Sequence, residues 1–320
     1  MSRYKVLITA PWFTKNNLEI LRKFFDVTLN DKGRWFTEDE LMNIISNYDA
    51  VIAGLDPFTA RVLDRAGKLR IIARRGIGYD NIDLAKASER GIYVTNTPIP
   101  AEVNAVAEFT VALILALTRG IVRSHELMRR DPVIAYRVRD SFLGKELNEM
   151  VIGILGLGNI GSRVAEKLRI LGAKEILYYD PYVNNPTYRK VNDLIELFSN
   201  SDVVTIHTPL TSETKGMVNY EVLSKAKRGI FIVNTARAEI IDRDSLIKAL
   251  EEGIVAGVAL DVFYKEPPDP GDYLLHSEKA IITPHIAAFT EKAFDEIDRI
   301  CVENVIKVLI RNEEPNYRVI

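Results

Sequence analysis

Short apolar runs alternate with stretches of helical spacing along residues 5–96 of the chain. The apolar runs are strand candidates because they are short and bounded by polar or turn-forming residues. Between them, apolar residues recur every three or four positions, which is the spacing of an amphipathic helix. The expected strands are residues 6–9, 50–53, 69–73 and 92–95, and the expected helices are residues 18–25, 38–45, 59–65 and 84–90. This alternation predicts βαβ units and therefore a parallel sheet.

The segment Thr97-Pro98-Ile99-Pro100 interrupts this pattern, because proline disfavours helix at the residue before it and donates no backbone hydrogen bond. We expect a hinge there. A long helix is predicted at residues 101–118, and a second alternating series runs from residue 150 to residue 282. A final helix, at residues 290–310, is followed by no strand and is expected to pack on the first domain. The pattern predicts an α/β protein with two doubly wound parallel-sheet domains, residues 1–100 with 288–320 and residues 101–287.

A glycine-rich segment, Gly156-Leu157-Gly158-Asn159-Ile160-Gly161, directly follows one apolar run and leads into a helical pattern. Such a pattern alone is weak, but here a second strand follows and ends at Asp180, about 20 residues past the last glycine. The glycines permit a tight turn and a close approach to a pyrophosphate, which the free amides of a helix N-terminus stabilise. Asp180 suits ribose hydroxyls and would repel a 2′-phosphate, and Pro181 leaves no basic residue beside it. The segment predicts NAD as cofactor; the alternative is a plain strand-to-helix turn with a surface aspartate.

Three charged side chains, Arg237, Glu266 and His285, each follow a short apolar run in the second series. In an open α/β sheet, ligands bind beyond the carboxyl ends of the strands, so the three side chains are expected to converge. A guanidinium can hold a carboxylate through two hydrogen bonds. An imidazole, with an unperturbed pKa near 6.5, can move a proton to or from a carbonyl oxygen. A carboxylate hydrogen-bonded to the other imidazole nitrogen would fix its tautomer and stabilise its cation.

Each of the three residues also has an ordinary structural interpretation. Arg237 can form a surface ion pair with Glu239, Glu266 can be a loop carboxylate, and His285 can fill a turn after Pro284. Taken singly, each structural interpretation is the better one, because charged loop residues are usually only solvated. Taken together, after successive strands of a nucleotide-binding sheet, the three residues favour an active site for hydride transfer with an anionic substrate.

Composition narrows the class of protein further. The chain has 320 residues, of which 47% are hydrophobic, which is enough to bury the cores of about two domains. A net charge of −2 with acids and bases interspersed argues against nucleic acid and anionic membranes as partners. The apolar stretch at residues 103–117 contains Glu108 and is shorter than the ~20 residues that span a bilayer, so we expect a buried helix. Cys301 is the single cysteine and no signal-peptide pattern is present, so we expect a cytoplasmic protein, and no metal site is predicted.

The chain resembles the NAD-dependent D-2-hydroxyacid dehydrogenases over nearly its whole length. The motifs that carry the resemblance are the glycine segment with Asp180, the segments 234–237 (NTAR), 261–263 with Glu266-Pro267, and 283–287 (TPHIA), and in the first domain 76–83 (GIGYDNID) and 96–98. The resemblance implies a Rossmann nucleotide-binding domain inserted into a flavodoxin-like substrate-binding domain. It also implies a homodimer built on the nucleotide-binding domains, with a small 2-oxo or 2-hydroxy acid as substrate.

The same resemblance assigns roles to individual residues. It gives Arg237 substrate orientation, His285 the acid/base step and Glu266 the support of that histidine. It places backbone amides of Ile77 and Gly78 on the substrate carboxylate. Formate dehydrogenases carry glutamine in place of Glu266, so formate is disfavoured as substrate. Cofactor contacts are implied for Gly156, Gly158, Asn159, Ile160, Gly161, Asp180, Pro181, His207, Thr208, Pro209, Thr235, Ala236, Arg237, Asp261 and His285.

The first domain is expected to determine which 2-oxo acid is bound, but its sequence has fewer motifs from which the substrate can be predicted. Arg74 and Arg75 precede the Gly76 loop and can meet a second anion or be plain solvated charges. Arg74 resembles an arginine of some phosphoglycerate dehydrogenases, whereas their second phosphate-facing arginine is replaced near Ala53. We therefore expect glyoxylate or hydroxypyruvate as substrate, with D-3-phosphoglycerate dehydrogenase as the alternative activity. A non-enzyme alternative is an NAD-sensing scaffold similar to the C-terminal binding protein corepressors.

Overall fold

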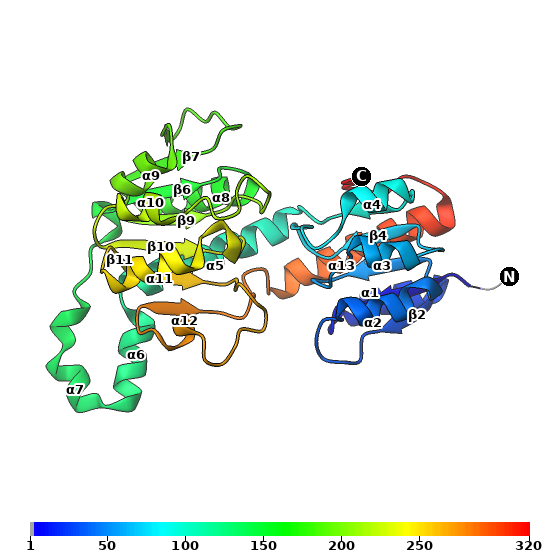
Figure 1. Ribbon diagram of the computed structural model, residues 1–320, viewed down its shortest axis with the longest axis horizontal. Helices are drawn as coiled ribbons and strands as arrows, with labels where there is room; N and C mark the ends of the chain where they lie inside the picture. The colour runs from blue at the N-terminus through cyan, green and yellow to red at the C-terminus, as the bar shows by residue number, and fades with distance from the viewer. Residues whose placement is uncertain (1–2) are drawn as a thin grey trace. The chain divides into compact units, whose positions relative to one another are not determined.

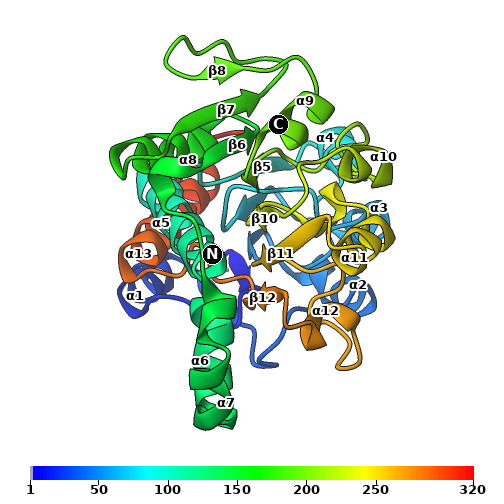
Figure 2. The same cartoon turned by 90° about the vertical axis from the view of Figure 1, so that its left-hand side faces the viewer.

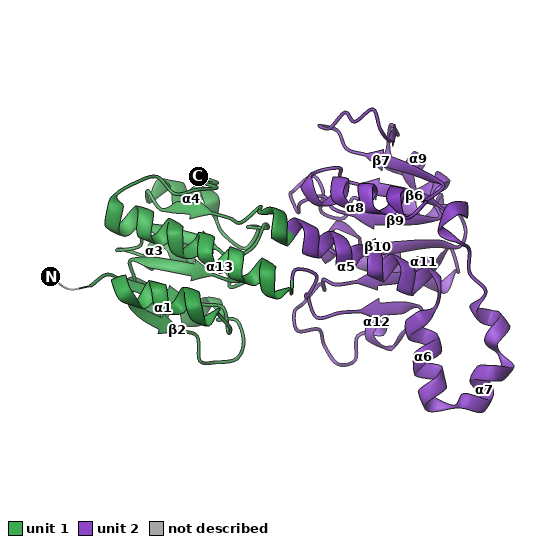
Figure 3. Ribbon diagram, turned by 180° about the vertical axis from the view of Figure 1, so that it is seen from behind, with its two compact units in different colours: residues 1–102, 289–320 green, residues 103–288 purple. Residues whose placement is uncertain are grey.

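The computed structural model describes residues 3–320, which divide into two compact units (Figure 3). Unit 1 consists of the described residues up to Glu102 together with Phe289–Ile320, and unit 2 consists of Val103–Ala288. These divisions fall close to the boundaries expected from the sequence. Unit 2 is therefore an insertion in the chain of unit 1.

Unit 1 contains a parallel five-stranded sheet in the order β2-β1-β3-β4-β5 (Figure 1). The central strands are short apolar runs that are fully buried, as the pattern predicted, whereas β2 is largely exposed at the edge. The strands are β1 (Lys5–Ile8), β2 (Asp26–Leu29), β3 (Ala50–Ala53), β4 (Ile71–Arg74) and β5 (Tyr93–Thr95). The helices are α1 (Lys15–Phe24), α2 (Glu38–Ile44), α3 (Ala60–Arg65), α4 (Leu84–Glu89) and α13 (Glu291–Ile306), with a 3-10 turn at Ile45–Asn47 and a π-helical turn at Lys307–Arg311. Helix α13 packs on α1 and β4, so the last helix belongs to this unit.

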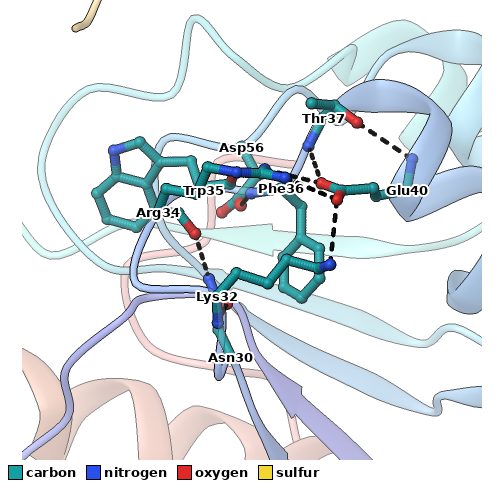
Figure 4. Close-up of polar contacts among 8 residues, drawn as sticks. All are labelled: Asn30, Lys32, Arg34, Trp35, Phe36, Thr37, Glu40 and Asp56. Carbon is teal, nitrogen blue, oxygen red and sulfur yellow. Dashed lines mark hydrogen bonds and ion pairs between the residues drawn. The ribbon is translucent and has the colours of Figure 1, made fainter.

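The loop between β2 and α2 is fixed by polar contacts at both of its ends (Figure 4). The carboxylate of Asp56, which is fully buried, accepts a hydrogen bond of 2.7 Å from the Phe36 amide. The Thr37 hydroxyl accepts a hydrogen bond from the Glu40 amide, and the Glu40 carboxylate accepts one from the Thr37 amide, which is a capping box at the start of α2. Two hydrogen bonds of 2.9 Å from the Arg34 guanidinium hold the pKa of Glu40 well below its usual range. This loop at the carboxyl edge of the sheet therefore has a defined shape.

Unit 2 contains a parallel seven-stranded sheet in the order β12-β11-β10-β9-β6-β7-β8 (Figure 2). The first strand in sequence, β6, lies between β9 and β7, so the chain reverses direction across the sheet beside β6. The strands are β6 (Val151–Leu155), β7 (Glu175–Tyr179), β8 (Arg189–Lys190), β9 (Val203–Ile206), β10 (Ile230–Asn234), β11 (Val255–Leu260) and β12 (Ala280–Ile282). The helices around it are α8 (Asn159–Ile170), α9 (Leu194–Asn200), α10 (Tyr220–Ser224), α11 (Arg243–Glu251) and α12 (Tyr273–His276), with 3-10 turns at Leu147–Glu149 and Ala238–Ile240.

Two apolar cores cover the two faces of this sheet. Alternation along β6 sends Leu155 into one core and Ile152 and Ile154 into the other, as expected for side chains of period two. Each fully buried leucine, isoleucine or valine contributes about 1.5–3 kcal/mol to folding. The strands are therefore held on both faces of the sheet, and the residues that follow their carboxyl ends have defined positions.

Helix α5 (Pro100–Thr118) begins with proline at its first position. An amide at this position would have no acceptor within the helix, so proline costs the helix no hydrogen bond there. By length and composition α5 is apolar enough to cross a membrane, but 61% of its most apolar window is buried in the protein. The expectation of a buried core helix is therefore confirmed. Two further helices follow, α6 (Ile121–Arg130) and α7 (Pro132–Arg137), with a 3-10 turn at Arg139–Phe142. Figures 1 and 2 show α6 and α7 extending away from the sheet of unit 2.

Candidate active site

The candidate residues of unit 2 follow the carboxyl ends of the strands of one sheet. Arg237, Glu266 and His285 come after β10, β11 and β12, which are neighbours in the sheet. The glycine segment follows β6, Asp180 follows β7, and the residues 207–209 follow β9. The predicted catalytic and cofactor residues thus lie along the same edge, where α/β sheets bind their ligands.

His285 and Glu266 are in direct contact. The imidazole Nδ1 lies 2.9 Å from Glu266 Oε2 and 3.1 Å from Oε1, and Oε1 also accepts a bond of 3.0 Å from the Phe263 amide. Burial opposes ionisation of Glu266, but the hydrogen bond and charge of His285, the Phe263 amide and the charge of Arg237 outweigh it, so the pKa of Glu266 is lowered. The glutamate is therefore an anion that fixes Nδ1 as the protonated nitrogen and leaves Nε2 for chemistry.

The backbone of His285 is left-handed, with φ of 56°, which is unusual for a residue other than glycine. Asp261, at the end of β11, holds this conformation from both sides of the histidine. Its carboxylate accepts bonds from the Thr283 hydroxyl at 2.6 Å, the Ile286 amide at 2.9 Å and the Ala287 amide at 2.8 Å. The family resemblance implies a cofactor contact for Asp261, whereas this support of the His285 turn is a second role that no pattern in the sequence indicates.

Arg237 lies in a turn built by Asn234. The Asn234 side chain donates to the Arg237 carbonyl at 2.8 Å and accepts from the Ala236 amide at 2.9 Å, so the turn after β10 is closed on both sides. The Arg237 guanidinium donates to the Ala236 carbonyl at 2.8 Å, and its charge lowers the pKa of Glu266. The three residues predicted as a catalytic group are therefore close in space.

The glycine segment has the shape that a dinucleotide requires. Gly156 has φ of 89°, and a Cβ there would lie 2.8 Å from the Thr208 amide nitrogen. A Cβ on Gly161 would collide with the carbonyl of Gly156, so helix α8 can start close to β6 only with glycine. At Gly158 a Cβ would meet nothing within 4 Å, so the space beside the N-terminus of α8 is open to a ligand. These residues fit a bound pyrophosphate.

Asp180 is nearly buried and receives three backbone amides. Its Oδ2 accepts from Leu157 at 2.8 Å, and its Oδ1 accepts from Tyr182 at 2.9 Å and Val183 at 3.0 Å. The alternative interpretation as a solvated surface aspartate is wrong, because 8% of the residue is exposed. Asp180 ties the glycine segment to the loop after β7, and oxygen lone pairs remain to accept ribose hydroxyls.

Two further cofactor candidates adjoin these strand ends. Burial lowers the pKa of His207 to about 3, so this imidazole is neutral at physiological pH; its Nε2 lies 2.9 Å from the Thr205 hydroxyl. Thr235 Oγ1 lies 3.0 Å from the hydroxyl of Thr110 on α5. Thr208, Pro209 and Ala236 lie in the same loops after β9 and β10, and Pro181 directly follows Asp180.

In unit 1, the predicted substrate residues lie at the end of β4 and directly after it. Arg74 and Arg75 are 5% and 9% exposed, so the alternative of solvated surface charge is wrong for both. A Cβ on Gly76 would collide with the Arg74 guanidinium, which also donates to the Arg75 carbonyl. The Ile77 amide donates to Glu102 Oε1 at 3.1 Å. Sequence reasoning did not single out Glu102.

Comparison with known proteins identifies the class of this chain. Residues 111–287, more than half of the chain, match the family described as D-isomer specific 2-hydroxyacid dehydrogenase, NAD binding domain. The match defines an NAD-dependent oxidoreductase, which confirms the expected enzyme class and its cofactor. The chain belongs to the D-isomer specific 2-hydroxyacid dehydrogenase family and acts in NAD-linked oxidoreduction of hydroxy acids.

Three relatives and one solved structure illustrate the match. The chain is 38% identical to a glyoxylate reductase of Thermofilum pendens, over 97% of this chain and 92% of that protein. It is 37% identical to a hydroxypyruvate reductase of Thermotoga maritima, over 97% and 99%. A D-3-phosphoglycerate dehydrogenase of Archaeoglobus fulgidus is 34% identical over 95% of this chain but 57% of its own length. The D-lactate dehydrogenase of Aquifex aeolicus, solved with NAD and lactic acid, has a TM-score of 0.84 and 29% identity, covering 97% of this chain and 96% of that one.

Proposed function

We propose that this enzyme reduces a small, unphosphorylated 2-oxo acid, glyoxylate or hydroxypyruvate, with Arg237, Glu266 and His285 as its catalytic residues. NADH, when bound, supplies the hydride that reduces the carbonyl carbon. The observation that carries the proposal is the His285–Glu266 pair at 2.9 Å beside the charge of Arg237. A general acid, its anionic partner and a carboxylate-binding cation are the groups that this reaction needs.

His285 carries out the proton transfer. Because Nδ1 is held by Glu266, Nε2 of the imidazolium is the atom that donates a proton to the carbonyl oxygen, and the same atom accepts it in the reverse direction. Glu266 stabilises the imidazolium through charge and orients its ring. The lowered pKa of Glu266 keeps that negative charge in place at neutral pH.

Substrate orientation is the task of Arg237. Its planar guanidinium can hold both oxygens of a carboxylate, and the adjacent carbonyl group is then presented in one orientation. The turn that Asn234 closes after β10 fixes the backbone position from which the Arg237 side chain extends. We place the backbone amides of Ile77 and Gly78 as further carboxylate donors, in a substrate-binding domain formed by unit 1. Unit 2 is the nucleotide-binding domain in this proposal.

The surroundings of Arg75 favour a substrate without phosphate. Its Nε donates to Asp298 Oδ1 at 2.5 Å, and its guanidinium lies 4.6 Å from the ring of Phe294. Asp298 is fully buried, so the charge of Arg75 is already neutralised inside unit 1. Binding a phosphate there would leave the buried carboxylate without its partner, which is costly. Ala53, also fully buried, offers no second cation.

Steady-state kinetics with NADH test the proposal across glyoxylate, hydroxypyruvate and 3-phosphohydroxypyruvate. We expect kcat/KM for glyoxylate or hydroxypyruvate to exceed that for the phosphorylated acid by at least about tenfold, which is about 1.4 kcal/mol of transition-state discrimination. A tenfold advantage for the phosphorylated acid would assign D-3-phosphoglycerate dehydrogenase activity instead. Absence of NADH oxidation with every 2-oxo acid, alongside retained NADH binding, would contradict the proposal as a whole.

A homodimer through the nucleotide-binding domains is part of the proposal, in a cytoplasmic enzyme whose single cysteine is a buried free thiol. Helix α6 has no buried residue, and the segment that follows it exposes 66% of Tyr136 and 87% of Leu143. Apolar side chains gathered on one projecting element are typical of an interface. A second copy of the same segment would cover them.

We expect light scattering after size-exclusion chromatography to give about twice the 36.1 kDa chain mass. Leu143→Glu should shift the enzyme towards the monomer because it places a charge in the apolar interface. Ile170→Glu is the matched control, because Ile170 is 71% exposed but lies on α8. A monomeric unaltered protein would exclude the dimer.

A further inference from the structure

A buried carboxylate lies beside the loop that follows β4. Glu102, in the first turn of α5, is 5% exposed. Its Oε2 accepts a hydrogen bond of 2.9 Å from the Thr97 hydroxyl, and its Oε1 accepts one of 3.1 Å from the Ile77 amide. A glutamate is almost never this buried unless partners compensate its loss of water. Here one of these partners belongs to the segment Gly76–Gly78.

Hydrogen bonds join this segment to the chain that leads into α5. The Thr97 amide donates to the Gly76 carbonyl at 3.2 Å, and the Asn96 side chain donates to the Ile77 carbonyl at 2.9 Å. Glu102 adds the third connection by accepting from the Ile77 amide. In the described part of the chain, the Gly78 amide donates to no acceptor, so it can receive a ligand anion.

Charged groups from two elements face this glutamate. Arg74 and Arg75 come from the end of β4, and their charges favour the ionised form of Glu102. Asp298 on α13 pairs with Arg75, and Cys301 on the same helix is neutral because burial raises its pKa. Burial of Glu102 is the larger effect and raises its pKa to about 7. The cluster therefore carries one more negative charge above neutral pH than below it.

We propose that Glu102 is a positioning residue that holds the Gly76–Gly78 loop, and that its charge sets the pH range in which the 2-oxo acid binds. The inference rests on the proposed function, in which this loop receives the substrate carboxylate. An ionised Glu102 repels that carboxylate and competes with it for the Ile77 amide. A neutral Glu102 does not repel the carboxylate, and its carbonyl oxygen is a weaker competitor for the Ile77 amide than an ionised oxygen is. The hydroxyl of Thr97 still keeps the glutamate side chain in place.

The sign of the pH effect follows from the raised pKa. Below about pH 7, Glu102 is neutral and the cluster carries one negative charge fewer, which favours the binding of an anion. As pH rises through 7, the carboxyl ionises and the affinity for the 2-oxo acid falls. By linkage, binding of the substrate anion at pH above 7 draws a proton onto Glu102.

The test compares the unaltered enzyme with Glu102→Gln between about pH 6 and 8.5. Glutamine keeps an acceptor for the Ile77 amide but cannot ionise. We expect the ratio of kcat/KM for glyoxylate, variant over unaltered enzyme, to be near one at the acidic end and to rise roughly 10-fold at the alkaline end. Because the variant and the unaltered enzyme are compared at the same pH, ionisations that the two proteins share cancel in this ratio. Glu108→Gln, an exposed glutamate on the same helix, is the matched control and should follow the unaltered enzyme throughout.

A second measurement tests the proposal without the Glu102→Gln variant, in case that variant does not fold. Calorimetric titration of NADH-loaded His285→Gln enzyme with oxamate, in two buffers of different ionisation enthalpy, reports proton uptake without the catalytic histidine. We expect uptake to persist at about pH 7.5. A pH-independent ratio in active proteins, or no proton uptake in this titration, overturns the role of Glu102 alone. An unaltered enzyme inactive with every 2-oxo acid removes the proposed function and this inference together.

Discussion

Replacing His285 with glutamine is expected to lower kcat by roughly 10²- to 10⁴-fold while the Kd for NADH stays nearly unchanged. Glutamine can hydrogen-bond to a carbonyl oxygen but cannot deliver a proton to it at neutral pH. The glycine segment and Asp180, which would hold the pyrophosphate and ribose of the cofactor, follow β6 and β7, so changing the side chain of the histidine after β12 leaves these two loops unaltered. The loss should therefore fall on proton transfer.

Single-turnover kinetics and NADH fluorescence titration separate these two effects. His276→Gln is the matched control, since this exposed histidine on α12 bonds only to the Pro270 carbonyl in the described residues, at 2.7 Å. It should retain full activity. If His285→Gln were as active as the unaltered enzyme, another group would supply the proton and the catalytic role of the His285–Glu266 pair would be lost.

Changing Arg237 to lysine should lower kcat/KM for the 2-oxo acid by about 10- to 100-fold, because charge-assisted hydrogen bonds contribute about 1.5–3 kcal/mol and the ammonium cannot form two in parallel. The positive charge remains, so the pKa of Glu266 keeps its downward shift. The change therefore isolates the geometry of carboxylate binding from the electrostatics of the site.

The measurement is a set of kcat and KM values with saturating NADH, compared with Arg243→Lys. Arg243, on α11, pairs with Asp272 at 2.9 Å and has no part in the proposed site, so its lysine variant should behave as the unaltered enzyme. An unchanged kcat/KM in Arg237→Lys would mean that other groups hold the carboxylate.

The sequence predicted the buried elements well because burial leaves a pattern. Strands that are covered on both faces are short apolar runs, so β3 was predicted at its observed bounds and β1, β4 and β5 within a few residues. The predicted convergence of Glu266 and His285 followed from the same reasoning, since the carboxyl ends of neighbouring parallel strands share one edge. Their contact at 2.9 Å bears out that geometry.

What the sequence did not predict is either exposed or held by long-range polar contacts. Strand β2 lies at a sheet edge and has no apolar run, and α6 buries no side chain, so neither has a hydrophobic signal. The burial of Arg75 depends on Asp298, which is more than two hundred positions away in the chain. The tasks of Asp261 and Glu102 depend likewise on amides brought near by folding.

The three amides that Asp180 receives bear on any attempt to redesign this enzyme for NADPH. Truncation to alanine would remove the negative charge that faces a 2′-phosphate. It would also leave the Leu157, Tyr182 and Val183 amides without their acceptor. Loss of those bonds would loosen the glycine turn needed by both nicotinamide dinucleotides. Asparagine keeps one acceptor oxygen, which can face either the Leu157 amide of the glycine segment or the Tyr182 and Val183 amides, so it loses fewer of these bonds than alanine does. Engineered coenzyme exchange should therefore begin with asparagine and add a cation on the loop after β7.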